Sequence, residues 1–92
     1  MAAPVDIGTM IVRTPGTCGG RPRIAGTRIT VQNVAIWTNS GWTPEKIVEQ
    51  YPHLRLAQIH AAVAFYRLNR AEIDARIAEE EAFAEQLESR AV

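Results

Sequence analysis

The sequence predicts a small, mainly α-helical domain of 92 residues. Two observations indicate this fold class. Glycine, proline and β-branched residues crowd the first third of the chain, whereas apolar residues recur at spacings of three and four beyond it. We therefore expect one domain over residues 1–92, built from a short β-ribbon (10–31), a three-helix core (31–68) and a C-terminal amphipathic helix (69–89).

The β-ribbon is predicted from two stretches of β-branched residues. Residues 10–12 suit a short strand, and the glycines and prolines of residues 14–22 demand turns. A second stretch predicts a hairpin that turns near Ala25 and Gly26. Because two or three short strands are not stable alone in water, the ribbon must pack on helices or pair with another chain. Residues 1–9 show no regular pattern, and a loose segment is expected there.

The first two core helices are predicted from their starts. Residues 31–38 have the spacing of a short helix that begins at Thr30 or Thr27. Thr43 is a suitable N-cap for the next helix, and Pro44 takes the first helical position, where its missing N–H costs nothing. A second proline, eight residues further on, stops this helix.

A third helix is predicted from Arg55 to Leu68 and a last one from about Ala71 to Glu88. The third helix has one apolar face at helical spacing: Leu56, Ile59, Val63 and Tyr66. Its opposite face is also apolar: Ala57, Ala61, Ala64, Phe65 and Leu68. The last helix carries a stripe that Glu80 interrupts: Ile73, Ile77, Ala84 and Leu87.

The spacing of the second and third helices matches a helix-turn-helix. In that interpretation Arg55 and Gln58, at the start of the third helix, face a DNA major groove, where Arg suits guanine and Gln suits adenine. The ribbon supplies three further candidates for phosphate contacts: Arg21, Arg23 and Arg28. The apolar outer face of the third helix fits a protein contact better than a DNA contact, so both alternatives stay open.

Composition excludes several classes of protein. A single cysteine, Cys18, rules out an intrachain disulfide and a Cys-rich zinc site, and we predict no metal and no cofactor. No nucleophile, base or phosphate-binding motif with suitable spacing is present, so neither an enzyme nor a small-molecule substrate is expected. The sequence has no apolar run long enough for a membrane span and no secretory leader, which predicts a cytoplasmic protein.

The zero net charge conceals a division along the chain. Residues 1–42 carry four arginines and one aspartate, and residues 43–70 carry four basic and two acidic residues. Residues 71–92 carry seven acidic and two basic residues. A basic front and an acidic tail indicate two ends with different partners. A chain this short, with no disulfide or metal and with an unpaired ribbon, is also predicted to form a homodimer.

Two motifs resemble a known family. The stretch GGRPRIAGTRI is followed by GWTPEKIVEQYPHLRLAQIHAA, in the order and at the spacing of the domain-of-unknown-function 433 family. The resemblance extends from about Ile11 to Leu87. The family often has Ser or Thr at the position of Arg55, so this chain lacks a good N-cap there and gains a charge.

This resemblance implies an antitoxin-like protein of a type II toxin-antitoxin pair, with a homeodomain-like helical core and a dimeric habit. It implies a PIN-like ribonuclease toxin as partner and binding of operator DNA through Arg55 and Gln58. By analogy with antitoxins generally, the last helix then holds the toxin through five residues: Ile73, Arg76, Ile77, Phe83 and Leu87. The alternative is a dimeric protein-interaction module with no DNA-binding activity.

Overall fold

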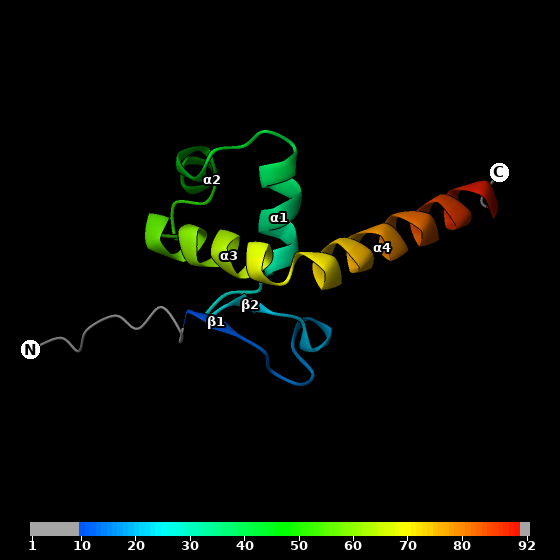
Figure 1. Cartoon of the computed structure of the whole chain (residues 1–92), viewed down its shortest axis with the longest axis horizontal. Coiled ribbons are helices and arrows are strands. Elements are labelled where there is room, and N and C mark those ends of the chain that lie inside the picture. Colours follow the sequence, from blue (N-terminus) through cyan, green and yellow to red (C-terminus); the bar gives the residue numbers. More distant parts are fainter. Residues whose placement is uncertain (1–9, 91–92) are drawn as a thin grey trace, which may run out of the picture.

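The computed structural model describes residues 10–90, so the segment 1–9 that we expect to be loose lies outside the described residues. Among the described residues the fold is mainly helical, with a short antiparallel β-hairpin at its N-terminal end (Figure 1). The elements are β1 (Ile11–Val12), the 3₁₀ turn η2 (Cys18–Gly20), β2 (Arg23–Ile24), α1 (Val31–Asn39), α2 (Pro44–Gln50), α3 (Leu56–Leu68) and α4 (Arg70–Arg90). The mainly α class that the sequence predicts is confirmed.

The ribbon is held together by few backbone contacts. Ile11 of β1 lies opposite Ile24 of β2, and an isolated bridge joins Arg23 to Thr30. Between these two, the chain turns through Gly26, whose φ of 78° is a conformation that suits glycine. The predicted turn near this glycine is thus confirmed. Because Ile24 is fully buried, the ribbon packs on the helices and does not stand alone.

Helices α1 and α2 each begin at a threonine whose side chain caps them. The hydroxyl of Thr30 accepts from the backbone N–H of Asn33 at 3.0 Å, while the Asn33 side chain accepts from the N–H of Thr30 at 3.1 Å. Thr43 caps α2 by accepting from the N–H of Lys46 at 3.2 Å. These bonds satisfy N–H groups that a helix start leaves unpaired. Of the two predicted starts of α1, the structure has Thr30.

The core lies between α1, α2, α3 and the ribbon. Its fully buried side chains come from every one of these elements: Ile24, Val31, Val34, Ile47 and Ile59. Trp37, Trp42 and Tyr51 line its edge as a stack, with ring centroids 5.9 Å apart between the two tryptophans and 4.9 Å between Trp37 and Tyr51. Both tryptophans thus pack their large rings beside the core.

The faces of α3 differ from the predicted ones at two positions. Leu56, placed on the buried stripe by its spacing, is 41% exposed, and Ala61, placed on the opposite face, is 6% exposed. The reason is that α1, α2 and the ribbon all pack on this helix, so that its buried arc is wide and is centred near Ile59 and Ala62. The outer side of α3 is nevertheless apolar, since Leu68 is 85% exposed.

Helix α4 starts one residue after α3 and leaves the core (Figure 1). Asn69 separates the two helices, with φ −123° and ψ 31°, and its side-chain amide donates to the carbonyl oxygen of Phe65 at 3.0 Å. The predicted division into a third and a last helix is confirmed. Ile73 is buried, but every residue from 81 to 90 is exposed, so the second half of α4 projects beyond the core.

We predict that Tyr66→Phe destabilises the fold by about 1–2 kcal/mol, because the buried Tyr66 hydroxyl links α1 to α4. The matched control is Tyr51→Phe, which keeps the ring stacked on Trp37 and should change the free energy of unfolding by less than about 0.5 kcal/mol. Urea unfolding followed by circular dichroism measures both. Equal losses in the two variants would contradict the role of the Tyr66 hydroxyl.

Candidate partner-binding surfaces

Arg23, one of the arginines predicted to contact DNA, braces the ribbon from inside. Its guanidinium donates to the carbonyl oxygen of Thr27 at 3.0 Å and to the hydroxyl of Thr14 at 2.9 Å. The side chain is half-buried, and its Nε atom is buried without a hydrogen-bond partner. Arg23 therefore closes the hairpin and holds the preceding loop against it.

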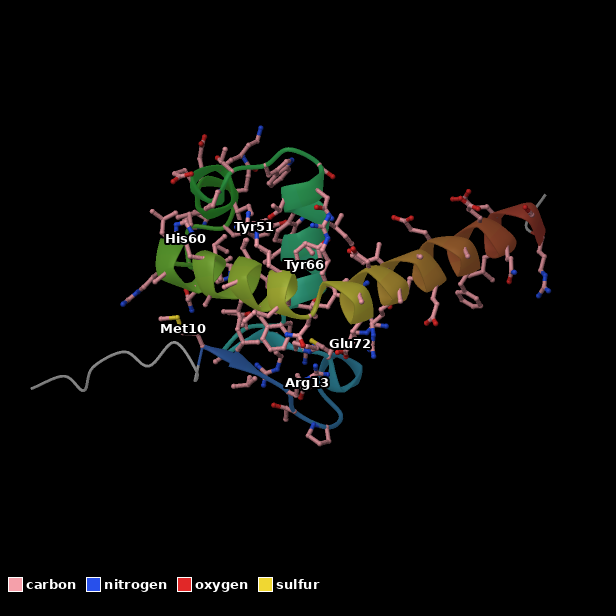
Figure 2. The ribbon with its side chains drawn as sticks, viewed as in Figure 1. Met10, Arg13, Tyr51, His60, Tyr66 and Glu72 are labelled. Atoms are coloured by element: carbon pink, nitrogen blue, oxygen red, sulfur yellow. The ribbon has the colours of Figure 1, made fainter. Side chains whose placement is uncertain are left out.

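Two other arginines of the N-terminal part pair with α4. Arg21, half-exposed, forms an ion pair with Glu80. Figure 2 shows Arg13 beside Glu72, and their side chains form an ion pair at 3.4 Å. The basic front and the acidic tail of the sequence thus partly neutralise each other within one chain. Of the three predicted phosphate contacts, Arg28 is the one with an exposed side chain.

The start of α3 brings Arg55 and Gln58 together, but in a structural role. The side-chain oxygen of Gln58 accepts from the backbone N–H of Arg55 at 2.7 Å. This bond replaces the Ser or Thr cap that Arg55 does not provide. Recognition of adenine by Gln uses both the oxygen and the NH2 group of its side chain, and here the oxygen already accepts one hydrogen bond from the backbone, which fixes how the side chain lies. Arg55 itself is exposed and remains available to a partner.

The outer side of α3, hereafter the α3 face, combines apolar and basic residues. It consists of Leu56, Ala57, His60, Ala64, Arg67 and Leu68, all of them exposed. No aspartate or glutamate occurs between Arg55 and Arg70. The α3 face is therefore largely apolar, with Arg67 as its one cation and no carboxylate.

The first half of α4 packs on the core. It contains part of the set of residues predicted to bind the toxin. Ile73 is 5% exposed, and Ile77 is partly buried against the core. Asp74 accepts from the Tyr66 hydroxyl at 2.6 Å. Glu80 accepts from the buried Gln32 side chain of α1 in addition to pairing with Arg21. These contacts fix the direction in which α4 leaves the core.

The second half of α4, residues 81–90, is hereafter the α4 tip. Phe83 is 62% exposed and Leu87 is 50% exposed, and their spacing of four puts them on one side of the helix. The tip also carries three glutamates and one arginine. A ten-residue helical segment is marginal in water by itself, and this one carries two large apolar side chains in solvent. Arg76, the remaining residue of the predicted set, is half-buried on the anchored half of α4.

The Cys18 thiol donates to the carbonyl oxygen of Arg28 at 3.6 Å, within the ribbon. Among residues 10–90, no three His, Cys, Asp or Glu side chains gather as metal ligands would. Over the same residues, no helix is both long enough and apolar enough to cross a bilayer.

Sequence reasoning missed the anchors of α4. Gln32 and Tyr66 were assigned no polar role, although their side chains hold Glu80 and Asp74. One signal was present, since Glu80 interrupts the apolar stripe of the last helix at a position that faces the core. A carboxylate at such a position needs a buried polar partner, and the sequence does not say which residue supplies it.

Comparisons with known proteins identify relatives of unknown function. The family model described as "Protein of unknown function (DUF433)" matches residues 11–66, so α4 lies beyond the matched segment. The chain is similar to the crystal structure of a DUF433 member protein from Anabaena variabilis ATCC 29413, with a TM-score of 0.71. The two sequences are 36% identical, and the match covers 76% of this chain and 69% of that chain. No protein of curated function matches the chain.

We predict that Arg23→Ala lowers the free energy of unfolding by about 1–3 kcal/mol, because it removes two charge-assisted hydrogen bonds from a half-buried site. Arg28→Ala is the matched control in the same hairpin, and since its side chain is exposed it should cost less than about 0.5 kcal/mol. Thermal and urea unfolding measure the difference. If Arg28→Ala lowers the free energy of unfolding as much as Arg23→Ala does, the hydrogen bonds of Arg23 do not stabilise the hairpin as we infer.

Proposed function

The chain belongs to the DUF433 family of proteins of unknown function, and we propose that it is an antitoxin-like protein that binds and neutralises a PIN-like ribonuclease toxin. One observation carries the proposal: an exposed, amphipathic half-helix projects from a compact core (Figure 1). The choice of a toxin as partner rests on the family resemblance of the sequence. Homodimerisation and a cytoplasmic location belong to the same proposal.

The α4 tip is the element proposed to hold the toxin. The core gives it a fixed direction through Asp74 and Glu80, so part of the entropy cost of ordering a binding segment is met before the partner arrives. Phe83 and Leu87 then act as anchors at helical spacing, the usual form of a helix bound in a groove. Ile73 and Ile77 contribute indirectly, because they pack the first half of α4 on the core.

The apolar side of the α4 tip defines the groove that would receive it. By helical spacing Glu81, Glu85 and Glu88 lie on the side of the helix away from Phe83 and Leu87, so the proposed toxin groove is apolar and the glutamates face away from it. A PIN-like active site is acidic and metal-binding, so an acidic helix is repelled from its centre. Arg76 and Arg90 are the cations on α4 suited to approach those carboxylates.

Binding of operator DNA is the second part of the proposal. It assigns α2 and α3 to a helix-turn-helix within a homeodomain-like core, with Arg28 and Arg55 as the exposed cations. Two observations favour the alternative, a dimeric interaction module that binds no DNA. Arg21 and Arg23 are engaged within the chain, and the outer side of α3 is largely apolar.

We predict that the pair Phe83→Ala and Leu87→Ala weakens toxin binding by at least about 30-fold, which corresponds to about 2 kcal/mol for the loss of buried anchors. The probe is the product of the gene next to this one, measured by calorimetry and by rescue of growth on co-expression. Ala82→Ser is the control, because this position lies on the other side of the helix from Leu87. Full neutralisation by the double variant would eliminate the tip as the toxin-binding element.

For DNA, we predict a mobility shift on the upstream region of the gene at low salt that weakens steeply as salt rises. Arg28→Ala and Arg55→Ala should each lower the salt slope by about 0.9 if they contact one phosphate. Gln58→Ala tests base reading separately, with thermal unfolding to correct for the lost cap. The absence of a specific shift at low salt selects the interaction module without DNA binding.

A further inference from the structure

We propose that two carboxylates of α4, those of Glu72 and Glu80, block a phosphate-binding surface of the ribbon, so that the folded chain limits its own affinity for nucleic acid. The blocked cations are Arg13 and Arg21, with which these glutamates pair. The inference deepens the proposed function by adding a regulation of DNA binding, and it rests on that function in one respect, namely that nucleic acid is a ligand. It concerns sequence-independent contacts with phosphates, not the reading of operator bases by α3.

The ribbon is a strongly cationic segment. Residues 10–31 carry four arginines and no aspartate or glutamate. Arg23 is bonded inside the hairpin, whereas Arg13, Arg21 and Arg28 keep at least part of their side chains in solvent. Several cations with no anion among them are typical of a surface that contacts phosphates. Any neutralisation of these arginines must come from elsewhere in the chain.

The first half of α4 supplies that neutralisation. Glu72 pairs with Arg13 at 3.4 Å (Figure 2), and Glu80 pairs with Arg21. The two glutamates are eight residues apart, which places them about 12 Å apart along the helix axis and about 80° apart around it. Arg76 lies midway between them at helical spacing. This surface therefore combines three cations with two carboxylates and is nearly neutral.

Pairing with a carboxylate opposes the binding of a phosphate by the same guanidinium. A cation gains affinity for DNA because it neutralises a phosphate and releases the counterions condensed there. An arginine that is already paired brings its carboxylate with it, and the phosphate repels that second anion. Glu72 and Glu80 thus compete with DNA for Arg13 and Arg21.

The two glutamates matter more for the charge of the ribbon than for the attachment of α4. Ile73 is buried, and Asp74 accepts from a buried tyrosine hydroxyl of α3, so the helix has other anchors. Exposed ion pairs contribute little to stability. The guanidinium of Arg13 also lies over the Phe65 ring, 5.9 Å from its centroid, and this contact keeps it in place without Glu72.

Removal of both carboxylates tests the inference on the full chain. The variant carries Glu72→Gln and Glu80→Gln, hereafter the unmasked variant, and its glutamine at the second position can still accept from Gln32. The probe is a duplex DNA of mixed sequence unrelated to the upstream region, measured by fluorescence anisotropy over a salt series. We expect affinity at low salt to rise at least 10-fold and the salt slope to steepen by about 1.8, since two more phosphates are neutralised.

Two controls separate local unmasking from a general change of charge. Glu81→Gln with Glu85→Gln makes the same change of net charge on the exposed α4 tip and should raise affinity less than about 3-fold. Adding Arg13→Gln and Arg21→Gln to the unmasked variant should return both affinity and slope to the parent values. Circular dichroism verifies that each variant is folded.

Each outcome decides the question. An unchanged affinity in the unmasked variant, an equal gain in the tip control, or a gain that survives loss of both arginines overturns the inference. A gain on anionic vesicles with none on DNA overturns it as well, because nucleic acid is then not the ligand. Failure of the proposed operator binding is recognised separately: the parent then shows no specific shift on the upstream region, while the unmasked variant still gains affinity for mixed-sequence DNA.

Discussion

The hydroxyl of Tyr66 is the contact on which the arrangement of this protein depends. Tyr66 is 3% exposed, so its hydroxyl must find partners inside the protein. It accepts from the Asn39 side chain at the end of α1 and donates to Asp74 near the start of α4. One atom of α3 thereby joins three helices, and Arg70, over the Tyr66 ring at 5.7 Å, covers the junction. The direction of α4 follows from this junction.

The direction of α4 determines which surfaces remain for partners. Because Ile73, Ile77 and Glu80 are used to attach the helix, the residues beyond them are left without core to pack on. The same attachment uses Arg21, and Arg13 pairs with Glu72, so much of the basic front is balanced within the chain. Two unlike surfaces result, an acidic projecting helix and a basic apolar helix face.

Much of the fold could be predicted because its signals are local. Thr30, Thr43 and Pro44 mark helix starts through hydrogen bonds to the next turn, and Gly26 marks a turn through its own backbone angles. The buried faces were less predictable. Leu56 has the spacing of a core residue, yet it is exposed because three elements pack on α3 from directions that spacing does not encode. Among the residues proposed to bind the toxin, Phe83 and Leu87 are exposed whereas Ile73 is core, a difference that helical spacing alone does not encode.

The sequence by itself determined the helices, the ribbon, the absence of a disulfide and the membership of a family, because each depends on neighbours along the chain or on motifs within it. The tertiary structure alone decided which charged side chains are bonded within the protein and which are exposed to solvent. Arg23 and Arg28 are five residues apart in one hairpin, yet the first is bonded inside it and the second faces solvent. Hydrogen-bond partners distant in sequence, such as Gln32 for Glu80, exist only after the helices pack, and that packing leaves the α4 tip exposed.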